Sequence, residues 1–318
     1  MRLSAADCLR RGWTNLAANW ELVLLQWLQS LLVVVLLALG VLLPVVALGA
    51  DALGSGRSAS RVLQVVTARL GRLSPAVLLA GVAMLAVWLL SVLVHSWFQA
   101  GTYGVLASAE RQALPGRRRP RLLFRTFSLR DFSGWGALYL GRFFRLLVFF
   151  WALALPLGFA LLVWLISLGV GGEVWGRPAV LGIGFGGLLP LGFLFLVAAL
   201  WSNIAQAAQA DLAREGSGAL AAARRGLTVL GRRLGAVAVL VFLVAGAGVA
   251  LAFLFVPLSA VPEMLLAGAP KLRAFVLVVL FLLQGIPSAL LALVLASSLV
   301  ALVRSEALRE IRPEVQTA

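Results

Sequence analysis

Groups that usually carry chemistry are scarce in this sequence of 318 residues. It contains one cysteine, Cys8, and one histidine, His95. A single cysteine allows no intramolecular disulfide. With one histidine we expect neither a histidine-based metal cluster nor a Ser-His-Asp triad. The sequence therefore predicts no metal site and no catalytic site of these kinds.

Acidic residues are also few, because Asp and Glu together number 12. All of them fall in expected loops, in tails or within a turn or two of the end of an apolar segment. This distribution argues against an ion-coupled transporter and against acid–base hydrolysis inside a membrane. Paired-carboxylate, HExxH, GxSxG and P-loop patterns are missing. We therefore predict a protein that is not an enzyme and that binds no cofactor.

Long apolar runs dominate what is present. Hydrophobic residues make up 62% of the chain and charged residues 12%, which excludes an ordinary soluble domain. Each run has at least the roughly 20 residues that a helix needs to cross about 30 Å of hydrocarbon. In lipid every backbone polar group needs an internal partner, so these runs are expected to be helices. The six runs lie near 22–49, 75–100, 146–170, 178–205, 235–258 and 274–303.

The net charge of +15 would suggest nucleic acid binding in a soluble protein. Here the arginines lie in short loops between apolar runs, so we expect no nucleic acid partner and instead contact with anionic inner-leaflet lipids. If both termini are cytoplasmic, the inner segments carry 20 basic residues and the outer loops carry 7. The positive-inside rule therefore predicts a multi-pass protein of a bacterial inner membrane with cytoplasmic N- and C-termini.

A short sequence motif occurs twice. Arg10–Leu16 returns as Arg224–Leu230, with five of seven positions identical and a constant spacing of 214 residues. Each copy is expected to be an amphipathic helix lying at the membrane interface. Ser4 and Asp7 form a possible capping box at the start of the first copy. The shared apolar stripe comprises Leu9, Trp13, Leu16 and Trp20 in the first copy and Ala223, Leu227, Leu230 and Leu234 in the second.

The ends of the even-numbered apolar runs also resemble one another. Each places an acid near an arginine, as in the pairs that begin at Glu110, Asp211 and Glu306. We therefore predict a single membrane domain, 1–318, made of three hairpins at about 1–111, 112–214 and 215–310, followed by a tail at 311–318. An interfacial helix is expected to precede each hairpin, and in the middle unit it would lie around 122–145. Common descent and convergence of similar interfacial helices both account for the repeat.

Uncharged polar residues gather near the inner ends of the predicted spans. One interpretation is that they hydrogen-bond between helices, which contributes roughly 0.6–2 kcal/mol per contact. The alternative is that they line a wet pocket open to the cytoplasm. The candidate polar cluster comprises His95, Gln99, Asn203, Gln206 and Gln209.

Arginines are densest between the second and third runs. They predict contact with anionic lipids, and a docking site for an acidic partner is the sharper alternative. The candidate patch comprises Arg117, Arg118, Arg119, Arg121, Arg125, Arg142 and Arg145.

The order of these features resembles one known family. The chain opens with the pattern Arg-Arg-Gly-Trp-x-x-Leu-x-x-Asn-Trp over Arg10–Trp20, followed by Gly101-Thr102-Tyr103-Gly104 and then Leu123-Phe124-Arg125. Over nearly its whole length it is similar to the membrane domain fused to some bacterial glycerophosphodiester phosphodiesterases and to stand-alone relatives of that domain. The resemblance implies a polytopic membrane fold. The phosphodiesterase activity of those fusions belongs to a separate soluble barrel, for which no expected cytosolic segment here is long enough.

These observations favour a non-enzymatic membrane scaffold or complex subunit. It would contact inner-leaflet lipids, a partner protein or a second copy of itself through the 108–145 loop and the interfacial helices. A transporter or lipid-handling protein with a polar pocket at the cytoplasmic helix ends is the alternative. An integral-membrane enzyme ranks third, because catalytic groups are lacking.

Overall fold

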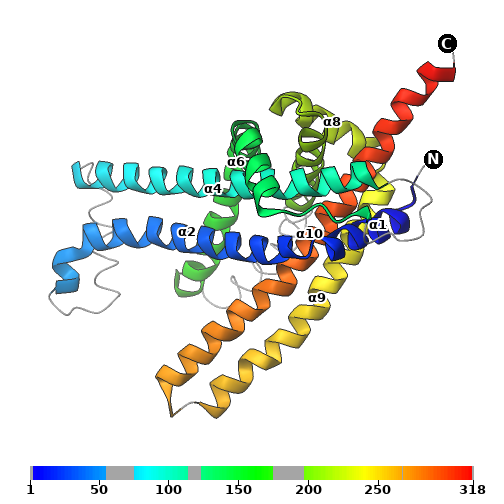
Figure 1. Cartoon of the computed structure of the whole chain (residues 1–318). Coiled ribbons are helices and arrows are strands. Elements are labelled where there is room, and N and C mark those ends of the chain that lie inside the picture. Colours follow the sequence, from blue (N-terminus) through cyan, green and yellow to red (C-terminus); the bar gives the residue numbers. More distant parts are fainter. Residues whose placement is uncertain (1–2, 55–74, 114–122, 175–196, 267, 317–318) are drawn as a thin grey trace. The chain divides into compact units, whose positions relative to one another are not determined.

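A computed structural model describes residues 3–54, 75–113, 123–174, 197–266 and 268–316. Every regular element in these ranges is a helix, which confirms the predicted all-α class for the described residues (Figure 1). A further helix covers 197–215. The helices with printed bounds are α1 (Ala5–Ala18), α2 (Glu21–Gly54), α4 (Pro75–Gln112), α6 (Leu129–Val174), α8 (Ala219–Arg232), α9 (Leu234–Leu265) and α10 (Pro270–Gln316).

Four helices are long and apolar enough to cross a membrane: Glu21–Gly40, Val77–Gln112, Leu234–Pro262 and Pro270–Leu308. Their side chains are mostly exposed; Leu79 on α4 is 71% exposed and Phe253 on α9 is 76% exposed. Such continuous apolar surface is stable in hydrocarbon and unstable in water. The four helices therefore indicate a membrane-embedded protein.

The predicted third and fourth spans are only partly described. The third, 146–170, lies within α6, which is helical throughout, although most of its side chains beyond Ala152 lie outside the described residues. The fourth, 178–205, is described only from residue 197 onward. Four of the six predicted spans are therefore long apolar helices that could cross a membrane, and the arrangement of six spans stays a prediction.

The chain divides into two compact units. Unit 1 comprises Met1–Asn19, Gln99–Ala250 and Leu291–Ala318, and unit 2 comprises Trp20–Phe98 and Leu251–Leu290. In unit 2 the indole N–H of Trp27 on α2 donates to the Leu282 carbonyl of α10 at 2.9 Å. A Cβ at Gly40 of α2 would lie 3.1 Å from Val87 of α4, so these two helices approach closely. Unit 2 is thus built from long helices that pack with few polar links.

The two copies of the repeated motif form α1 and α8, which both contain 14 residues and start 214 residues apart. The predicted capping box is confirmed, because the Asp7 N–H donates to Ser4 Oγ and the Ser4 N–H donates to the Asp7 carboxylate. α1 ends before α2 begins, and α8 ends before α9 begins. Each copy is therefore a helix separate from the apolar helix that follows it in the sequence.

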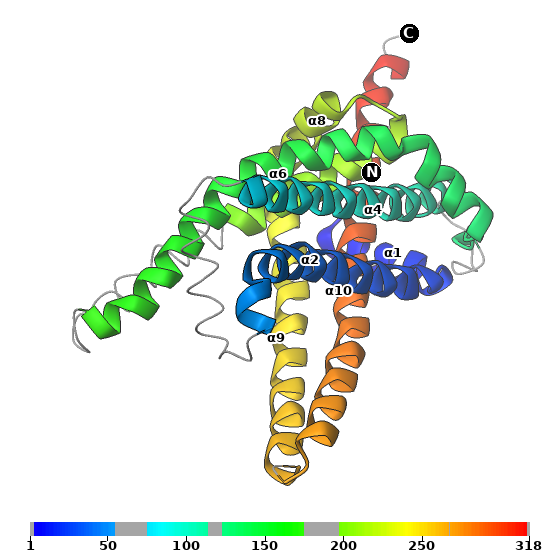
Figure 2. The same cartoon turned by 90° about the vertical axis from the view of Figure 1, so that its left-hand side faces the viewer.

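The predicted middle hairpin contains a helix start that matches that of α1. α6 begins at Leu129, capped by Ser128, whose Oγ accepts from the Asp131 N–H at 3.0 Å. Leu129 lies 124 residues after Ala5, the first residue of α1. The expected interfacial helix around 122–145 is thus the first part of α6, which continues into the third run without a break, and Figure 2 shows the α6 ribbon changing direction along its length.

Candidate functional site

When α1, α6 and α8 are aligned at their first residues, three corresponding segments can be compared. We call them the leading segments: α1, residues 129–145 of α6, and α8. The corresponding positions Cys8, Phe132 and Ala222 are all 0% exposed. All three leading segments belong to unit 1. They lie against three returning helices, which we define as α4, the 197–215 helix and α10.

Each leading segment lies against a returning helix at a glycine. A Cβ at Gly12 of α1 would lie 2.7 Å from the backbone nitrogen of Ser298 on α10. A Cβ at Gly226 of α8 would lie 2.8 Å from the backbone nitrogen of Ala208 in the 197–215 helix. At the third contact the glycine belongs to the returning helix, because a Cβ at Gly101 of α4 would lie 2.7 Å from the Phe132 ring of α6. Absence of a side chain therefore sets the closest approach in all three contacts.

The end of each leading segment binds the turn that precedes the next one. Asn19, the residue after α1, donates from Nδ2 to the Phe124 carbonyl at 2.7 Å and accepts at Oδ1 from the Phe127 N–H at 2.9 Å, just before α6. Arg142 in α6 donates to the Gly216 carbonyl, just before α8. Arg233, the residue after α8, donates to the Leu3 carbonyl, just before α1. The three joints link the leading segments in a closed order, which we call the ring.

A buried carboxylate on α4 holds two other helices of unit 1. Glu110 is 1% exposed and pairs through Oε2 with Arg11 of α1 at 2.9 Å and with Arg304 of α10 at 3.4 Å. Its Oε1 atom is buried without a hydrogen-bond partner. Because Glu110 is buried, its negative charge is balanced by these two arginines and not by water. Loss of one partner leaves a buried charge.

A second carboxylate, Asp211, lies at the end of the 197–215 helix and is 2% exposed. It pairs with Arg214 at 3.5 Å and with Arg225 of α8 at 3.7 Å. Burial raises the pKa of Asp211, and the arginines Arg225 and Arg214 oppose that shift. Glu215, which pairs with both arginines, completes this cluster.

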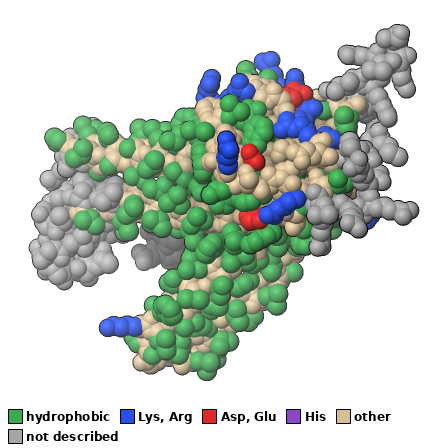
Figure 3. Space-filling view, in the orientation of Figure 1, with side chains coloured by type: hydrophobic (Ala, Val, Ile, Leu, Met, Phe, Trp, Pro, Cys, Tyr) green, Lys and Arg blue, Asp and Glu red, His purple; other side chains and the backbone are tan. Residues whose placement is uncertain are grey.

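The third carboxylate, Glu306, lies on α10 and is 4% exposed. Its Oε1 atom pairs with Arg233 Nε at 3.1 Å. Each of the three acids that were predicted at related helix ends therefore pairs with an arginine from a leading segment or from the residue after it. These ion pairs fix the leading segments to the returning helices, and on the face shown in Figure 3 the charged side chains of unit 1 gather where α1, α8 and the end of α4 lie.

An aromatic stack within α6 contacts Arg111 of α4. The Trp135 and Tyr139 rings stack with centroids 5.5 Å apart, and Arg111 and Arg142 each lie 5.6 Å from one of the rings. Arg111 also donates to the Arg214 carbonyl at 3.2 Å. Both arginines therefore bind carbonyls at the end of the 197–215 helix, where the helix dipole favours positive charge.

The predicted polar cluster has members in both units. His95 belongs to unit 2, where its Nδ1 lies 2.7 Å from Nε2 of Gln29. Asn203 donates to the Ala199 carbonyl of its own helix, and Gln206 donates to Ser202 of the same helix at 3.4 Å. The side-chain oxygens of Asn203 and Gln206 are buried without partners. Gln209 is 5% exposed, and Gln99 begins the second segment of unit 1.

The predicted basic patch is described only in part. Arg117, Arg118, Arg119 and Arg121 lie outside the described residues. Arg125 donates to the Ala18 carbonyl at the end of α1 at 2.6 Å, and Arg145 donates to the Gly141 carbonyl at 3.1 Å. With Arg142 at Gly216, the described members of the patch all bind backbone carbonyls of this chain.

Two buried asparagines were missed by the sequence analysis. Asn15 and Asn19 are 0% exposed, and Asn15 donates to the Leu106 carbonyl of α4 at 3.1 Å. They are four residues apart and therefore share a helix face. The sequence signal available for these buried residues was a pair of polar residues on the helix face opposite Trp13.

The face of α1 and α8 away from these contacts is exposed. Trp13 is 51% exposed and its counterpart Leu227 is 58% exposed. Arg10 and Arg224, the first arginines of the two motifs, are also exposed, whereas Arg11 and Arg225 pair with acids. In each motif the second arginine therefore pairs with acids of this chain, although Arg225 is itself 51% exposed, and the first is exposed beside an apolar side chain.

Among the residues that the structure describes, no group of three His, Cys, Asp or Glu side chains is placed to hold a metal ion. The resemblance to the membrane domain of phosphodiesterase fusions stays a prediction. No protein-family model, no curated protein and no solved structure matches this chain.

Proposed function

We propose that this chain is a non-enzymatic scaffold or complex subunit of a bacterial inner membrane. It would have six spans in three hairpins, with both termini in the cytoplasm. The ring would lie at the inner surface and hold the three hairpins together. Its outward faces would contact anionic lipids or a partner protein.

The different use of the two arginines in each motif carries this proposal. Arg11 and Arg225 pair with buried acids, so their charges are balanced within the protein. Arg10 and Arg224 are exposed next to Trp13 and Leu227. A cation beside an exposed large apolar side chain matches the phosphate and acyl layers of a membrane surface.

The test removes the outward cations and compares the material that co-purifies in mild detergent. The variant Arg10→Gln/Arg224→Gln is expected to lose anionic lipid or a specific protein partner. The variant Lys271→Gln/Arg273→Gln is the matched control, because it removes two cations from the first turn of α10, on the predicted opposite side. Equal losses from the two variants, or no loss from either, would contradict the proposal.

Orientation is tested with single cysteines and a membrane-impermeant reagent on intact cells. Residues Ser55, Glu173 and Ala267 are expected to be labelled after replacement by cysteine. Arg118→Cys and Ser217→Cys are expected to be protected, because the positive-inside rule places them in the cytoplasm. Labelling of Arg118→Cys from outside would overturn the orientation.

A transporter or lipid-handling protein is the second candidate, favoured by the unpartnered buried oxygens of Asn203 and Gln206. Such atoms are costly unless a ligand or water binds them. If they line a pocket, Asn203→Leu would leave thermal stability unchanged or higher and abolish retention of a solute or lipid. If they are structural, the same change would lower stability by about 1 kcal/mol or less.

A further inference from the structure

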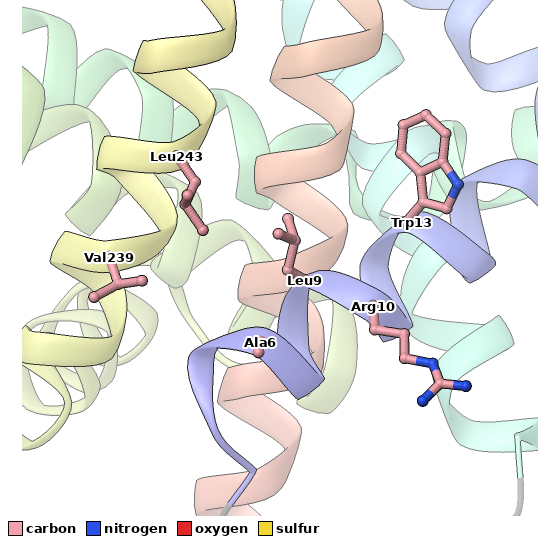
Figure 4. A pocket seen from close by; sticks show the side chains of 6 residues that line it. All are labelled: Ala6, Leu9, Arg10, Trp13, Val239 and Leu243. Atoms are coloured by element: carbon pink, nitrogen blue, oxygen red, sulfur yellow. The ribbon is translucent and has the colours of Figure 1, made fainter.

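An apolar groove runs between α1 and α9 within unit 1. Its volume is about 420 Å³, and it is lined by Ala6, Leu9 and Trp13 of α1 and by Val239 and Leu243 of α9. In Figure 4 Leu9 lies nearest the α9 side chains, whereas the Trp13 ring points away from them. Val239 and Leu243 are 48% and 47% exposed, so no described part of the chain covers them fully. The groove is large enough for a small ligand by the usual range of roughly 300–1,000 Å³.

The walls of the groove exclude most classes of ligand. Apart from Arg10, every side chain that lines it is hydrophobic. A polar metabolite would need several hydrogen-bond partners to offset its lost hydration. An acyl chain needs none, and its burial is favourable by roughly 0.8 kcal/mol per CH₂ group.

A single cation marks one edge of the groove. Arg10 lines the groove, and its guanidinium extends away from the apolar side chains (Figure 4). The Asp7 carboxylate, one turn earlier, accepts from both Ser4 N–H and Ser4 Oγ in the capping box. An arginine with an apolar stem and an exposed head is arranged to bind a phosphate above a hydrocarbon chain.

The position of the groove along α9 agrees with this arrangement. Val239 and Leu243 follow Arg233 by six and ten residues, which corresponds to about 9 and 15 Å along a helix. Arg233, the residue before α9, pairs with Glu306. The groove therefore begins beyond this ion pair along α9, within the part of the helix that is apolar enough to lie in hydrocarbon.

We propose that this groove binds one anionic phospholipid, with an acyl chain between α1 and α9 and the phosphate on Arg10. The inference rests on the proposed function only in placing α9 in a membrane. It adds a defined lipid site where that function requires general contact with a membrane surface.

The motif on α8 supplies a matched control. Arg224 and Leu227 correspond to Arg10 and Trp13, but Val239 and Leu243 belong to the groove beside α1. Loss of Arg224 removes an equivalent exposed cation without touching this groove. A general effect of charge is therefore separable from binding at one site.

The test titrates detergent-purified full-length protein with dioleoyl phosphatidylglycerol or dioleoyl phosphatidylcholine and counts bound lipids by native mass spectrometry. One tight phosphatidylglycerol adduct is expected. Arg10→Gln should weaken it about fivefold, the effect expected for one cation at a membrane surface, and should reduce the preference over phosphatidylcholine. Leu243→Trp fills the groove and should weaken both lipids at least tenfold, whereas Arg224→Gln should leave the adduct unchanged.

Equal weakening by Arg10→Gln and Arg224→Gln, or an adduct that survives Leu243→Trp, would overturn the lipid site. If Leu243→Trp does not fold, Leu243→Asp places a charge in the groove and makes the same prediction. A protein that co-purifies in a Leu243-dependent way, in place of lipid, would also overturn it. If the groove variants have no effect while Arg10→Gln/Arg224→Gln still loses anionic lipid, the scaffold function stands and the specific site does not.

Discussion

The two copies of the repeated motif, α1 and α8, have the same length and bury three corresponding pairs, Cys8/Ala222, Gly12/Gly226 and Leu16/Leu230, yet they make different polar contacts. Gly12 and Gly226 both lie against a returning helix, and Leu16 and Leu230 are 2% and 3% exposed. In α8, Gly226 and Arg225 both contact the 197–215 helix. In α1 the corresponding residues contact two different helices: Gly12 lies against α10, whereas Arg11 pairs with Glu110 of α4.

The difference shows which features a ring of three leading segments requires and which it leaves variable. A small residue at the contact and an exposed apolar face occur in both copies. The residue after the helix varies, being Asn19 in one copy and Arg233 in the other, although both bind the turn before the next leading segment. Shared residues therefore serve local packing, and variable residues match each copy to its neighbours.

The largest expected difference lies between the two acids that pair with the copies, Glu110 with α1 and Asp211 with α8. Glu110→Gln should lower the free energy of unfolding by about 3 kcal/mol, because it leaves the partly buried Arg11 and Arg304 without an ionised partner. Asp211→Asn should cost less, because burial already disfavours the ionised form of Asp211. Thermal unfolding in detergent at pH 7 measures both, and an Asp211→Asn variant less stable than Glu110→Gln would contradict the comparison.

The contribution of Asp211 to stability is also expected to depend on pH. Its folded-state pKa is raised above the usual value of 3.8, so its contribution to stability is full below that value and is lost as the pH rises through the folded-state pKa. Asp211→Asn should remove this loss, which a series of unfolding curves above pH 4 would detect. An unchanged pH profile would show that Asp211 is not its source.

The glycines should show the next largest effect. Gly226→Ala should lower the free energy of unfolding by about 2 kcal/mol, because the three atoms nearest its new Cβ all belong to backbone. Gly12→Ala should cost less, since two of its three nearest atoms are serine hydroxyl oxygens that can rotate.

Gly231→Ala in α8 is the control, because nothing lies within 4 Å of its Cβ position. It should raise stability by up to about 1 kcal/mol through helix propensity. Thermal unfolding under the same detergent conditions ranks the three variants, and a Gly231→Ala variant as unstable as Gly226→Ala would disprove close packing at the contact.

Asn19 tests the joints of the ring. Asn19→Ala removes the acceptor of the Thr126 and Phe127 N–H groups and should cost about 1–2 kcal/mol. Hydrogen exchange should increase at 124–127, and Thr14→Ala on the exposed side of α1 should leave that exchange unchanged. If exchange at 124–127 stays slow in Asn19→Ala, other contacts hold this segment.

The smallest effect is expected where the two copies already agree. Cys8→Ala gives α1 the residue that α8 carries at Ala222, and it should change stability by less than about 1 kcal/mol because both positions are fully buried. Burial also raises the pKa of the Cys8 thiol to about 11. Alkylation of native protein at pH 8 should therefore be slow compared with alkylation after denaturation, and rapid labelling would show that α1 detaches from unit 1.

Local chemistry explains why parts of the fold and of the site could be predicted. The first residues of α2, α4, α9 and α10 lie close to the starts of runs of apolar residues, which require only backbone hydrogen bonding in lipid. The Ser4 capping box is predictable because its two partners are three residues apart. The start of α6 at Leu129 was not predicted, since the Arg-Arg-Gly signal is missing there and only scattered positions, Ser128, Asp131, Gly136 and Leu140, match the first copy.

The sequence by itself determined the helical class, the apolar surface and the faces of α1 and α8, because each depends on residues within a few turns of one another. Only the tertiary structure decided that Arg11 pairs inward while Arg10 stays exposed, and that Asn19 and Arg233 join the leading segments. Helical periodicity places residues on a face, but it does not choose the partner of that face. Arg233 and Leu3 are 230 positions apart, so their contact depends on how helices far apart in the sequence pack together in unit 1.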